Sequence, residues 1–287
     1  MRMVGKHDRR QMRTFISVPT RECIATNLWA KVLGTCALAS ILVGCGTRSV
    51  EIPEIGEFEA DRVLFERGRE AIDEGNWSVA REYFTQIRDN YPQSDYRAES
   101  RLQIGDSYEG EGTLGSYVRA LEAYQDFMSL YPTHPRVAYA QYKVGMVHLR
   151  QMNSAERDQT ETLNAIAEFE IFVARYPADH ELMAQVRQAL RSAHDRLSEH
   201  DYLVGSFYFR FRNYAGAISR FRQIVENDPG YTGRDRVYLR LAVSLAETQQ
   251  TAEAIPYLSR ILEEFDNSEH AGDARRLLDE LTSAQER

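Results

Sequence analysis

The chain has 287 residues, enough for one large or two ordinary domains, and its formal net charge is −8. The first 44 residues hold seven Lys or Arg and only two acidic residues, so the rest of the chain is more acidic than the whole. This balance argues against nucleic acid as a partner and against broad electrostatic docking on anionic lipid, because both need a basic surface. Ala, Leu, Arg and Glu are frequent and strand-like alternation is missing, which predicts an all-α protein.

An uncharged run over residues 32–44 follows a basic N-terminal stretch. It is shorter than the roughly 20 residues that a transmembrane helix needs, and it has the layout of a secretory signal. The run ends in Leu-Val-Gly-Cys at Cys45, which matches the lipobox of bacterial lipoproteins. We therefore expect a signal peptide over 1–44 and a lipidated tether over 45–58. The alternative is an ordinary signal peptide with an incidental cysteine.

Cleavage before Cys45 would leave a single cysteine at the first position, because Cys23 and Cys36 both precede it. A disulfide within the processed chain and a CxxC metal or redox site are then excluded. The next residue, Gly46, is not Asp, which in lipoproteins favours the outer membrane over the inner one.

From residue 61 onward the chain repeats itself. Each of four copies has an Ala, an aromatic residue and a Pro at fixed spacing, with a Gly upstream of the Ala. The four sets are Gly68, Ala80, Phe84 and Pro92; Gly105, Ala120, Tyr124 and Pro132; Gly145, Ala165, Phe169 and Pro177; and Gly205, Ala217, Phe221 and Pro229. The pattern resembles the tetratricopeptide repeat, a helix–turn–helix unit in which small residues let the helices approach and Pro ends the second helix. A fifth, degenerate copy contains Ala242 and Ala254 and has Asp266 where Pro would be.

Extra residues interrupt the repeat pattern at three places and divide the repeats into two groups. Extra residues fall at 110–115 and, in larger number, in a loop over 152–162. Between the third and fourth copies, residues 180–197 keep a helical apolar stripe without a breaker, so we predict one long helix over 180–211. Residues 270–284 form a final amphipathic helix that can cap the open end. The predicted fold is a superhelical array of five repeats with a capping helix, with repeats one to three over 59–179 and repeats four and five over 180–287.

These departures resemble the BamD (ComL) family, tetratricopeptide lipoproteins of the outer-membrane β-barrel assembly machinery. The matching segments are His134-Pro135 with Ala138-Tyr139-Ala140 and Lys143-Val144-Gly145, then Arg157-Asp158-Gln159-Thr160, Asp195-Arg196-Leu197 and the stretch from Tyr214 to Arg220. The resemblance implies a lipid-anchored protein on the periplasmic face of the outer membrane. It also implies binding to the POTRA region of the barrel insertase BamA, to small accessory lipoproteins in some lineages, and to C-terminal targeting segments of unfolded β-barrel proteins.

A groove for such a segment is expected on the concave face, which the first helix of each repeat lines in this fold. Counting helical positions from the glycine of each repeat selects Phe65, Arg69 and Ile72 in the first repeat, Leu102 in the second, and Tyr139 and Tyr142 in the third. An Arg beside apolar and aromatic side chains suits an extended peptide with a terminal carboxylate. The alternative is that these side chains only complete the packing between repeats.

A second surface is expected to hold the insertase. Arg220 lies at the family's Asn-Arg position and is a candidate charge contact with an acidic group on BamA; alternatively it is a solvated arginine near a Glu. Arg157 and Asp158 in the inserted loop form either an interface or a loop-closing ion pair.

The sequence carries no recognisable catalytic or cofactor-binding motif. The chain has no phosphate-binding glycine pattern, and its His residues lack metal-ligand spacing. We expect no enzyme activity, no cofactor and no metal. A second hypothesis is another envelope tetratricopeptide lipoprotein, such as a pilotin or a cell-division coordinator; the loop and long helix over 152–211 favour the BamD-type protein.

Overall fold

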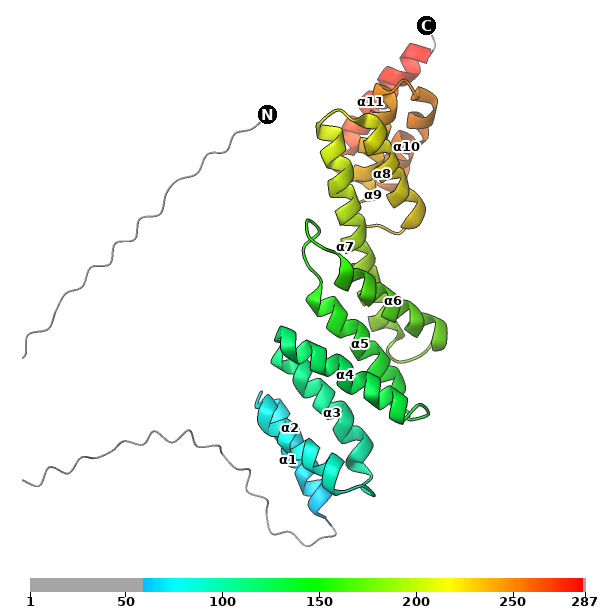
Figure 1. The fold of residues 1–287 in the computed structure, drawn as a ribbon. Coiled ribbons are helices and arrows are strands. Elements are labelled where there is room, and N and C mark those ends of the chain that lie inside the picture. Colours follow the sequence, from blue (N-terminus) through cyan, green and yellow to red (C-terminus); the bar gives the residue numbers. More distant parts are fainter. Residues whose placement is uncertain (1–58, 286–287) are drawn as a thin grey trace, which may run out of the picture. The chain divides into compact units, whose positions relative to one another are not determined.

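The structure is a computed structural model that describes residues 59–285. The predicted signal peptide, Cys45 and the tether lie outside the described residues. Within 59–285 the chain forms eleven α-helices and no strand (Figure 1). The helices are α1 Ala60–Asp73, α2 Trp77–Asn90, α3 Tyr96–Glu111, α4 Leu114–Leu130, α5 Val137–Gln151, α6 Thr160–Arg175, α7 Met183–Arg210, α8 Tyr214–Asn227, α9 Arg234–Glu247, α10 Thr251–Glu264 and α11 Ala271–Gln285. The all-α prediction is confirmed.

The helices pair as helix–turn–helix repeats. Each helix packs against the next one in the chain, and first helices of neighbouring repeats also touch, as α1 touches α3, α5 touches α7 and α7 touches α9 (Figure 1). We call α1, α3, α5, α7 and α9 the A helices and α2, α4, α6, α8 and α10 the B helices. Each repeat therefore buries its apolar face against its neighbours, as a solenoid does.

Glycine and an aromatic ring meet at the crossing inside each of the first four repeats. A Cβ atom built on Gly205 would lie 2.6 Å from the ring of Phe221, and one on Gly145 would lie 2.5 Å from the ring of Phe169. Both rings are fully buried. Only glycine lets the A helix approach its B helix this closely, so the predicted role of the small residues is confirmed.

The B helices end where the prolines predict. Helices α2, α4, α6 and α8 each stop two residues before a Pro, because the residue before Pro disfavours helical backbone and Pro itself lacks an N–H donor. The fifth copy lacks Pro, and α10 ends at Glu264 all the same. Helix α11 packs on α10 and α9 and buries Ala274 in the last core cluster, which confirms the predicted cap.

The extra residues at 110–115 lengthen helices and do not form a loop. Helix α3 runs to Glu111, Gly112 adopts left-handed backbone with φ 71°, and α4 starts at Leu114. Thr113 caps α4: its side chain accepts from the Ser116 backbone N–H, while the Thr113 N–H donates to the Ser116 hydroxyl.

The predicted long helix is observed as α7, which has 28 residues. Its first half places Met183, Val186 and Ala193 in the core of the third repeat, and its second half places Tyr202 in the core of the last two repeats. The division of the array at 179/180 stays a prediction. In the part of the chain that the structure describes, no helix combines the length and the apolar character needed to cross a membrane.

Candidate groove and partner surface

Three of the predicted groove residues line one cavity. Phe65, Arg69 and Ile72 of α1 enclose a volume of about 410 Å³. The other lining residues are Asp73 of α1, Glu99 and Gln103 of α3, and Arg136, the residue before α5. The cavity therefore lies between α1 and α3 and reaches the residue that precedes α5.

The floor of this cavity is aromatic. The Phe65 ring stacks on Tyr96 with a centroid distance of 4.9 Å and meets Phe84 edge-on at 5.6 Å. Phe65 is thus held by repeat packing and still half-buried, so one ring face borders the cavity. Phe65 can therefore contribute to the packing between repeats and also contact a bound peptide.

The two arginines of the cavity differ in their surroundings. Arg136 lies 3.5 Å from a Glu99 carboxylate oxygen, and its guanidinium covers the Tyr139 ring at 4.2 Å. Arg69 is exposed, and no ion pair among the described residues involves it. Arg69 is therefore the cation with spare hydrogen-bonding capacity at this cavity.

The tyrosines of the third repeat lie outside this cavity. The Tyr139 hydroxyl donates to Asp106 Oδ1 at 2.9 Å, and burial together with this carboxylate raises the pKa of Tyr139 well above its usual range. Tyr142 is half-buried and packs on Phe169 at 6.4 Å between ring centroids. Tyr142 thus helps to join α5 to α6, and neither tyrosine lines the cavity of Phe65.

Leu102 is a wrong prediction for the groove surface. Its side chain is fully buried in the core cluster with Tyr124 and Phe127, so a bound peptide has no access to it. Leu102 occupies the position of Phe65 relative to its glycine, but the helices around it in the core of the second and third repeats cover it completely. Glu99 and Gln103 are the residues of α3 that border the cavity.

A buried charge network lies beneath Tyr139. Glu109 is 2% exposed and contacts the Lys143 ammonium, which also lies 3.4 Å from Asp106. The guanidinium of Arg150 lies 2.9 Å from the other Glu109 oxygen. Lys143 is the only lysine after Lys31 in the chain, and it is used here to neutralise buried carboxylates between α3 and α5. The sequence carried no signal for this network beyond the rarity of lysine.

The inserted loop is closed by amide hydrogen bonds. Gln159 Nε2 donates to the carbonyl oxygens of Ser154 and Arg157, each at 2.9 Å. Asp158 accepts from the Thr160 backbone N–H at 3.0 Å, and hydrogen bonds from Thr160 lower the pKa of the Asp158 carboxyl. No ion pair among the described residues joins Arg157 to Asp158, and both side chains are exposed. The loop-closing ion pair is therefore not observed.

The loop is fixed to the long helix. His200 Nδ1 of α7 donates to the Ala155 carbonyl at 2.7 Å. On α8, Arg220 is partly exposed and lies 3.8 Å from Asp201 and 3.3 Å from Gln223. Its acidic neighbour is thus an Asp on α7 and not a Glu.

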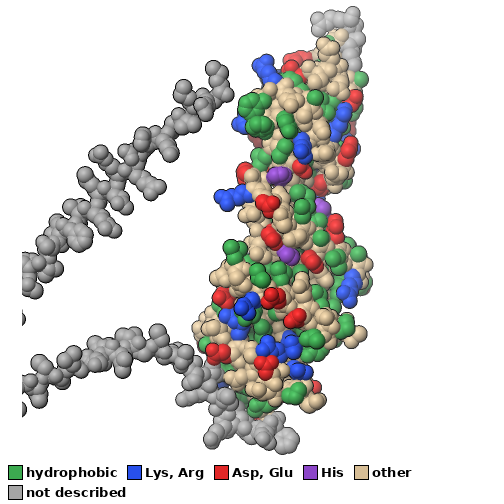
Figure 2. Space-filling model, viewed as in Figure 1, with side chains coloured by type: hydrophobic (Ala, Val, Ile, Leu, Met, Phe, Trp, Pro, Cys, Tyr) green, Lys and Arg blue, Asp and Glu red, His purple; other side chains and the backbone are tan. Residues whose placement is uncertain are grey.

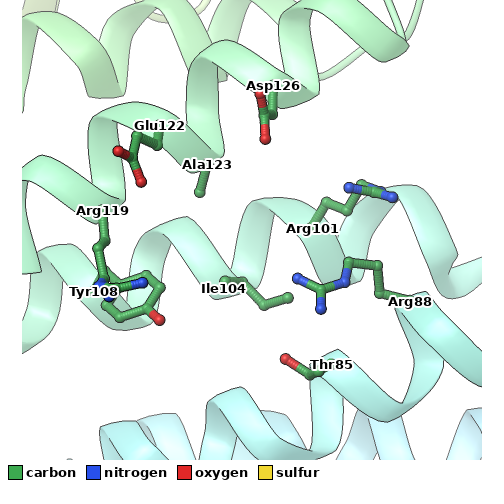
Figure 3. Close-up of a pocket in the computed structure, with 9 residues that line it drawn as sticks. All are labelled: Thr85, Arg88, Arg101, Ile104, Tyr108, Arg119, Glu122, Ala123 and Asp126. Carbon is green, nitrogen blue, oxygen red and sulfur yellow. The ribbon is translucent and has the colours of Figure 1, made fainter.

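A further cavity of about 340 Å³, which sequence reasoning missed, lies between α2, α3 and α4. Figure 3 shows Arg88 and Arg101 on one side of it and the carboxylates Glu122 and Asp126 of α4 on the other. Its walls carry both signs of charge. Within residues 59–285, no cluster of His, Cys, Asp or Glu is suited to hold a metal ion.

A family model described as "Outer membrane lipoprotein" and named YfiO matches residues 59–246, which is more than half of the chain. The chain belongs to this family. A tetratricopeptide-repeat model matches residues 236–268, the degenerate fifth copy of the YfiO-family chain.

Relatives of this YfiO-family chain include proteins named outer membrane protein assembly factor BamD. The one from Caulobacter vibrioides is 27% identical over 198 residues, 69% of this chain and 63% of that protein. This chain thus spans less than two thirds of the Caulobacter relative. The Vibrio cholerae protein is 23% identical over 66% of this chain and 80% of its own length, and the Neisseria gonorrhoeae protein is 22% identical over 87% and 90%. The resemblance to the BamD family is confirmed.

Proposed function

We propose that this chain is an outer-membrane protein assembly factor, a scaffold that acts by binding and not by catalysis. It receives C-terminal targeting segments of unfolded β-barrel proteins and presents them to a BamA-type barrel insertase. Lipidation at Cys45 holds it to the outer membrane, facing the periplasm, by a tether over 45–58. Membership of the YfiO family and the names of the relatives support this role.

The cavity of Phe65, Ile72 and Arg69 is the observation that carries the substrate side of the proposal. Apolar side chains on α1 offer contact area to an aromatic or aliphatic side chain of the peptide. Arg69, which has no ion-pair partner among the described residues, offers paired N–H donors to a carboxylate. A peptide that ends in an aromatic residue with a free carboxylate satisfies both at once.

The partner side of the proposal uses other elements. The exposed loop with Arg157 and Asp158, and Arg220 on α8, face solvent and are offered as contacts with the POTRA region of the insertase. Small accessory lipoproteins are further candidate partners. A pull-down with the lipidated chain in mild detergent tests this side: recovery of a POTRA-containing barrel protein supports it, and recovery of pilus or division proteins instead contradicts it.

Peptide binding tests the substrate side. A fluorescent peptide ending in Phe with a free carboxylate should bind the processed chain, and amidation of its C-terminus or the change Arg69→Gln should each weaken binding about tenfold. Arg67→Gln is the matched control, because Arg67 is also exposed on α1 but lies outside the cavity. Equal affinities for the two peptides and the two variants would refute the groove assignment.

A further inference from the structure

In three of the five repeats, one face of the A helix packs against the preceding repeat. It comprises the residues five before, one before and two after the glycine of that helix, or after Ala242 in the fifth repeat. These residues are buried in three repeats: Ser100, Ile104 and Ser107 in the second, Ala140, Val144 and Val147 in the third, and Val237, Leu241 and Ser244 in the fifth. Ile104, for example, belongs to the core cluster of the first repeat. We call this face the incoming face.

The first repeat shows what the incoming face is like where no described helix precedes it. Two of its three residues there are Arg67 and Glu70, and both are exposed. Charged side chains are what an end repeat needs on a face that meets water.

The fourth repeat is different, because its incoming face carries an apolar residue that is exposed. Its incoming face on α7 consists of His200, Val204 and Phe207, and the apolar surface continues to Phe211. Phe207 is 52% exposed and Phe211 is 66% exposed, with their ring centroids 4.8 Å apart. Val204 and Phe207 are thus apolar, like Val144 and Val147 in the covered face of the third repeat, but Phe207 is exposed, like Arg67 and Glu70 of the first repeat.

The length of α7 explains the opening. The first half of α7 already packs on α6, with Met183 and Val186 in the core of the third repeat. The B helix of that repeat is used there, so among the described helices no B helix is left to cover the second half of α7. The inserted loop is hydrogen-bonded to α7 at His200, one turn before Val204, through the Ala155 carbonyl. Val204 and Phe207 belong to none of the core clusters formed by the described residues.

The open face has a basic border. Arg210 and Arg212 flank the two rings, both are exposed, and no ion pair among the described residues involves either. In Figure 2, hydrophobic side chains lie beside basic ones near the end of α7 that Figure 1 places next to α8.

We propose that this face of α7 binds an amphipathic helix of a partner protein, which takes the position of the missing B helix. In three other repeats the incoming face receives a helix of the preceding repeat, so its geometry is suited to a helix and not to a strand. Phe207 and Phe211 enter the apolar stripe of the partner helix. Acidic residues beside that stripe pair with Arg210 and Arg212. This proposal goes beyond the assembly function above and depends on neither the Phe65 cavity nor Arg220.

Site-specific photocrosslinking in cells that carry the full lipidated chain tests the proposal. Benzoylphenylalanine replaces Phe207 in one variant and Glu70, the equivalent residue of the first repeat, in the control. We expect about tenfold more crosslinked product at 207 than at 70, mapped by mass spectrometry to a segment with apolar residues at helical spacing and neighbouring Asp or Glu. Equal yields, or crosslinks at 207 to lipid, to a second copy of this chain or to an extended segment, would overturn the proposal.

A double variant separates binding from folding. Phe207→Ser introduces the residue found at this position in the second and fifth repeats, and it is combined with Phe211→Ser. Because both rings are exposed in the isolated chain, we expect Tm to change by no more than about 2 °C. Crosslinking through benzoylphenylalanine at Leu203 should fall about tenfold in the double variant. A large fall in Tm, or unchanged crosslinking, would show that the rings serve the chain's own fold and not a partner.

Discussion

Gly205 of α7 and Phe221 of α8 approach so closely that a Cβ atom at position 205 would lie 2.6 Å from the ring. Ordinary carbon–carbon contacts lie at about 3.5–4.0 Å, so any larger residue must push the two helices apart. The Phe221 ring is fully buried and has no open space to move into. The helices of the fourth repeat can therefore cross at this distance only because residue 205 has no Cβ atom.

Gly205→Ala should therefore lower the free energy of unfolding by about 1–3 kcal/mol, in spite of the higher helix propensity of Ala. Urea denaturation of the processed chain measures the change. Gly115→Ala in α4 is the control, because no atom lies within 4 Å of the added methyl group there and the gain in helix propensity should be retained. If both variants were equally stable, the close crossing would not be a constraint on the fold.

Replacing Gln249 by Gly should stabilise the chain. The A-to-B turns use left-handed backbone, with Gly75 at φ 73° in the first repeat and Gln249 at φ 63° in the fifth. A side chain in this region costs about 1 kcal/mol or more, so Gln249→Gly should raise the free energy of unfolding by a similar amount. The reverse change, Gly75→Ala, should lower it. Denaturant titration checks both, and a destabilising Gln249→Gly would contradict this account of the turn.

Asp228 should make stability depend on pH. Burial by itself would raise the pKa of Asp228, but hydrogen bonds from Arg191 and Ser198 outweigh it and lower the pKa below its ordinary value. The Arg191 contact is bidentate, at 2.8 and 2.5 Å, and joins α7 to the end of α8. Since the folded pKa is the lower one, this stabilisation is present above the unfolded pKa of about 3.9 and is lost as pH falls through the folded value.

Asp228→Asn should accordingly cost about 2–4 kcal/mol at pH 7, and the difference from the natural chain should shrink as pH falls below about 4. Thermal or urea unfolding from pH 7 to pH 3 provides the comparison. Asp126, an exposed carboxylate without an ion pair among the described residues, supplies the control Asp126→Asn. A pH-independent difference would exclude the carboxylate charge as the cause.

Removing the charge of Lys143 should be costly. Lys143→Met leaves Glu109, 2% exposed, with only Arg150 as a cationic partner, and should destabilise the chain by about 3–5 kcal/mol. The Arg150 side chain is 49% exposed, so Arg150→Met should cost no more than about 1 kcal/mol. Urea denaturation measures the free energy of unfolding of both variants. Equal losses of stability would mean that the Lys143 ammonium is no more important to the network than the Arg150 guanidinium.

Much of the fold follows from short-range pattern. The recurrence of Gly, Ala, an aromatic residue and Pro predicts helix pairs, their order and the ends of the B helices, because each of these residues acts within its own repeat. The long helix and the cap follow as well, from an unbroken apolar stripe over 180–197 and an amphipathic end. The extra residues at 110–115 were less informative, because added length can extend helices as easily as it forms a loop.

Site residues were predicted less well, because the exposure of a side chain depends on which helices of the neighbouring repeats pack against it. Phe65, Arg69 and Ile72 border one cavity, whereas Leu102 at the repeat position of Phe65 is buried. Nothing in the residue types alone separates these cases.

By itself, the sequence determined the helical array, the order of its helix pairs and the family, since all of these rest on residues that recur along the chain. Only the tertiary structure decided which side chains are open, which cations are already paired, and that Phe207 and Phe211 on α7 have no described helix in front of them. The physical reason is that burial and pairing are properties of neighbouring repeats. A single long helix shifts those neighbours without changing the pattern within any one repeat.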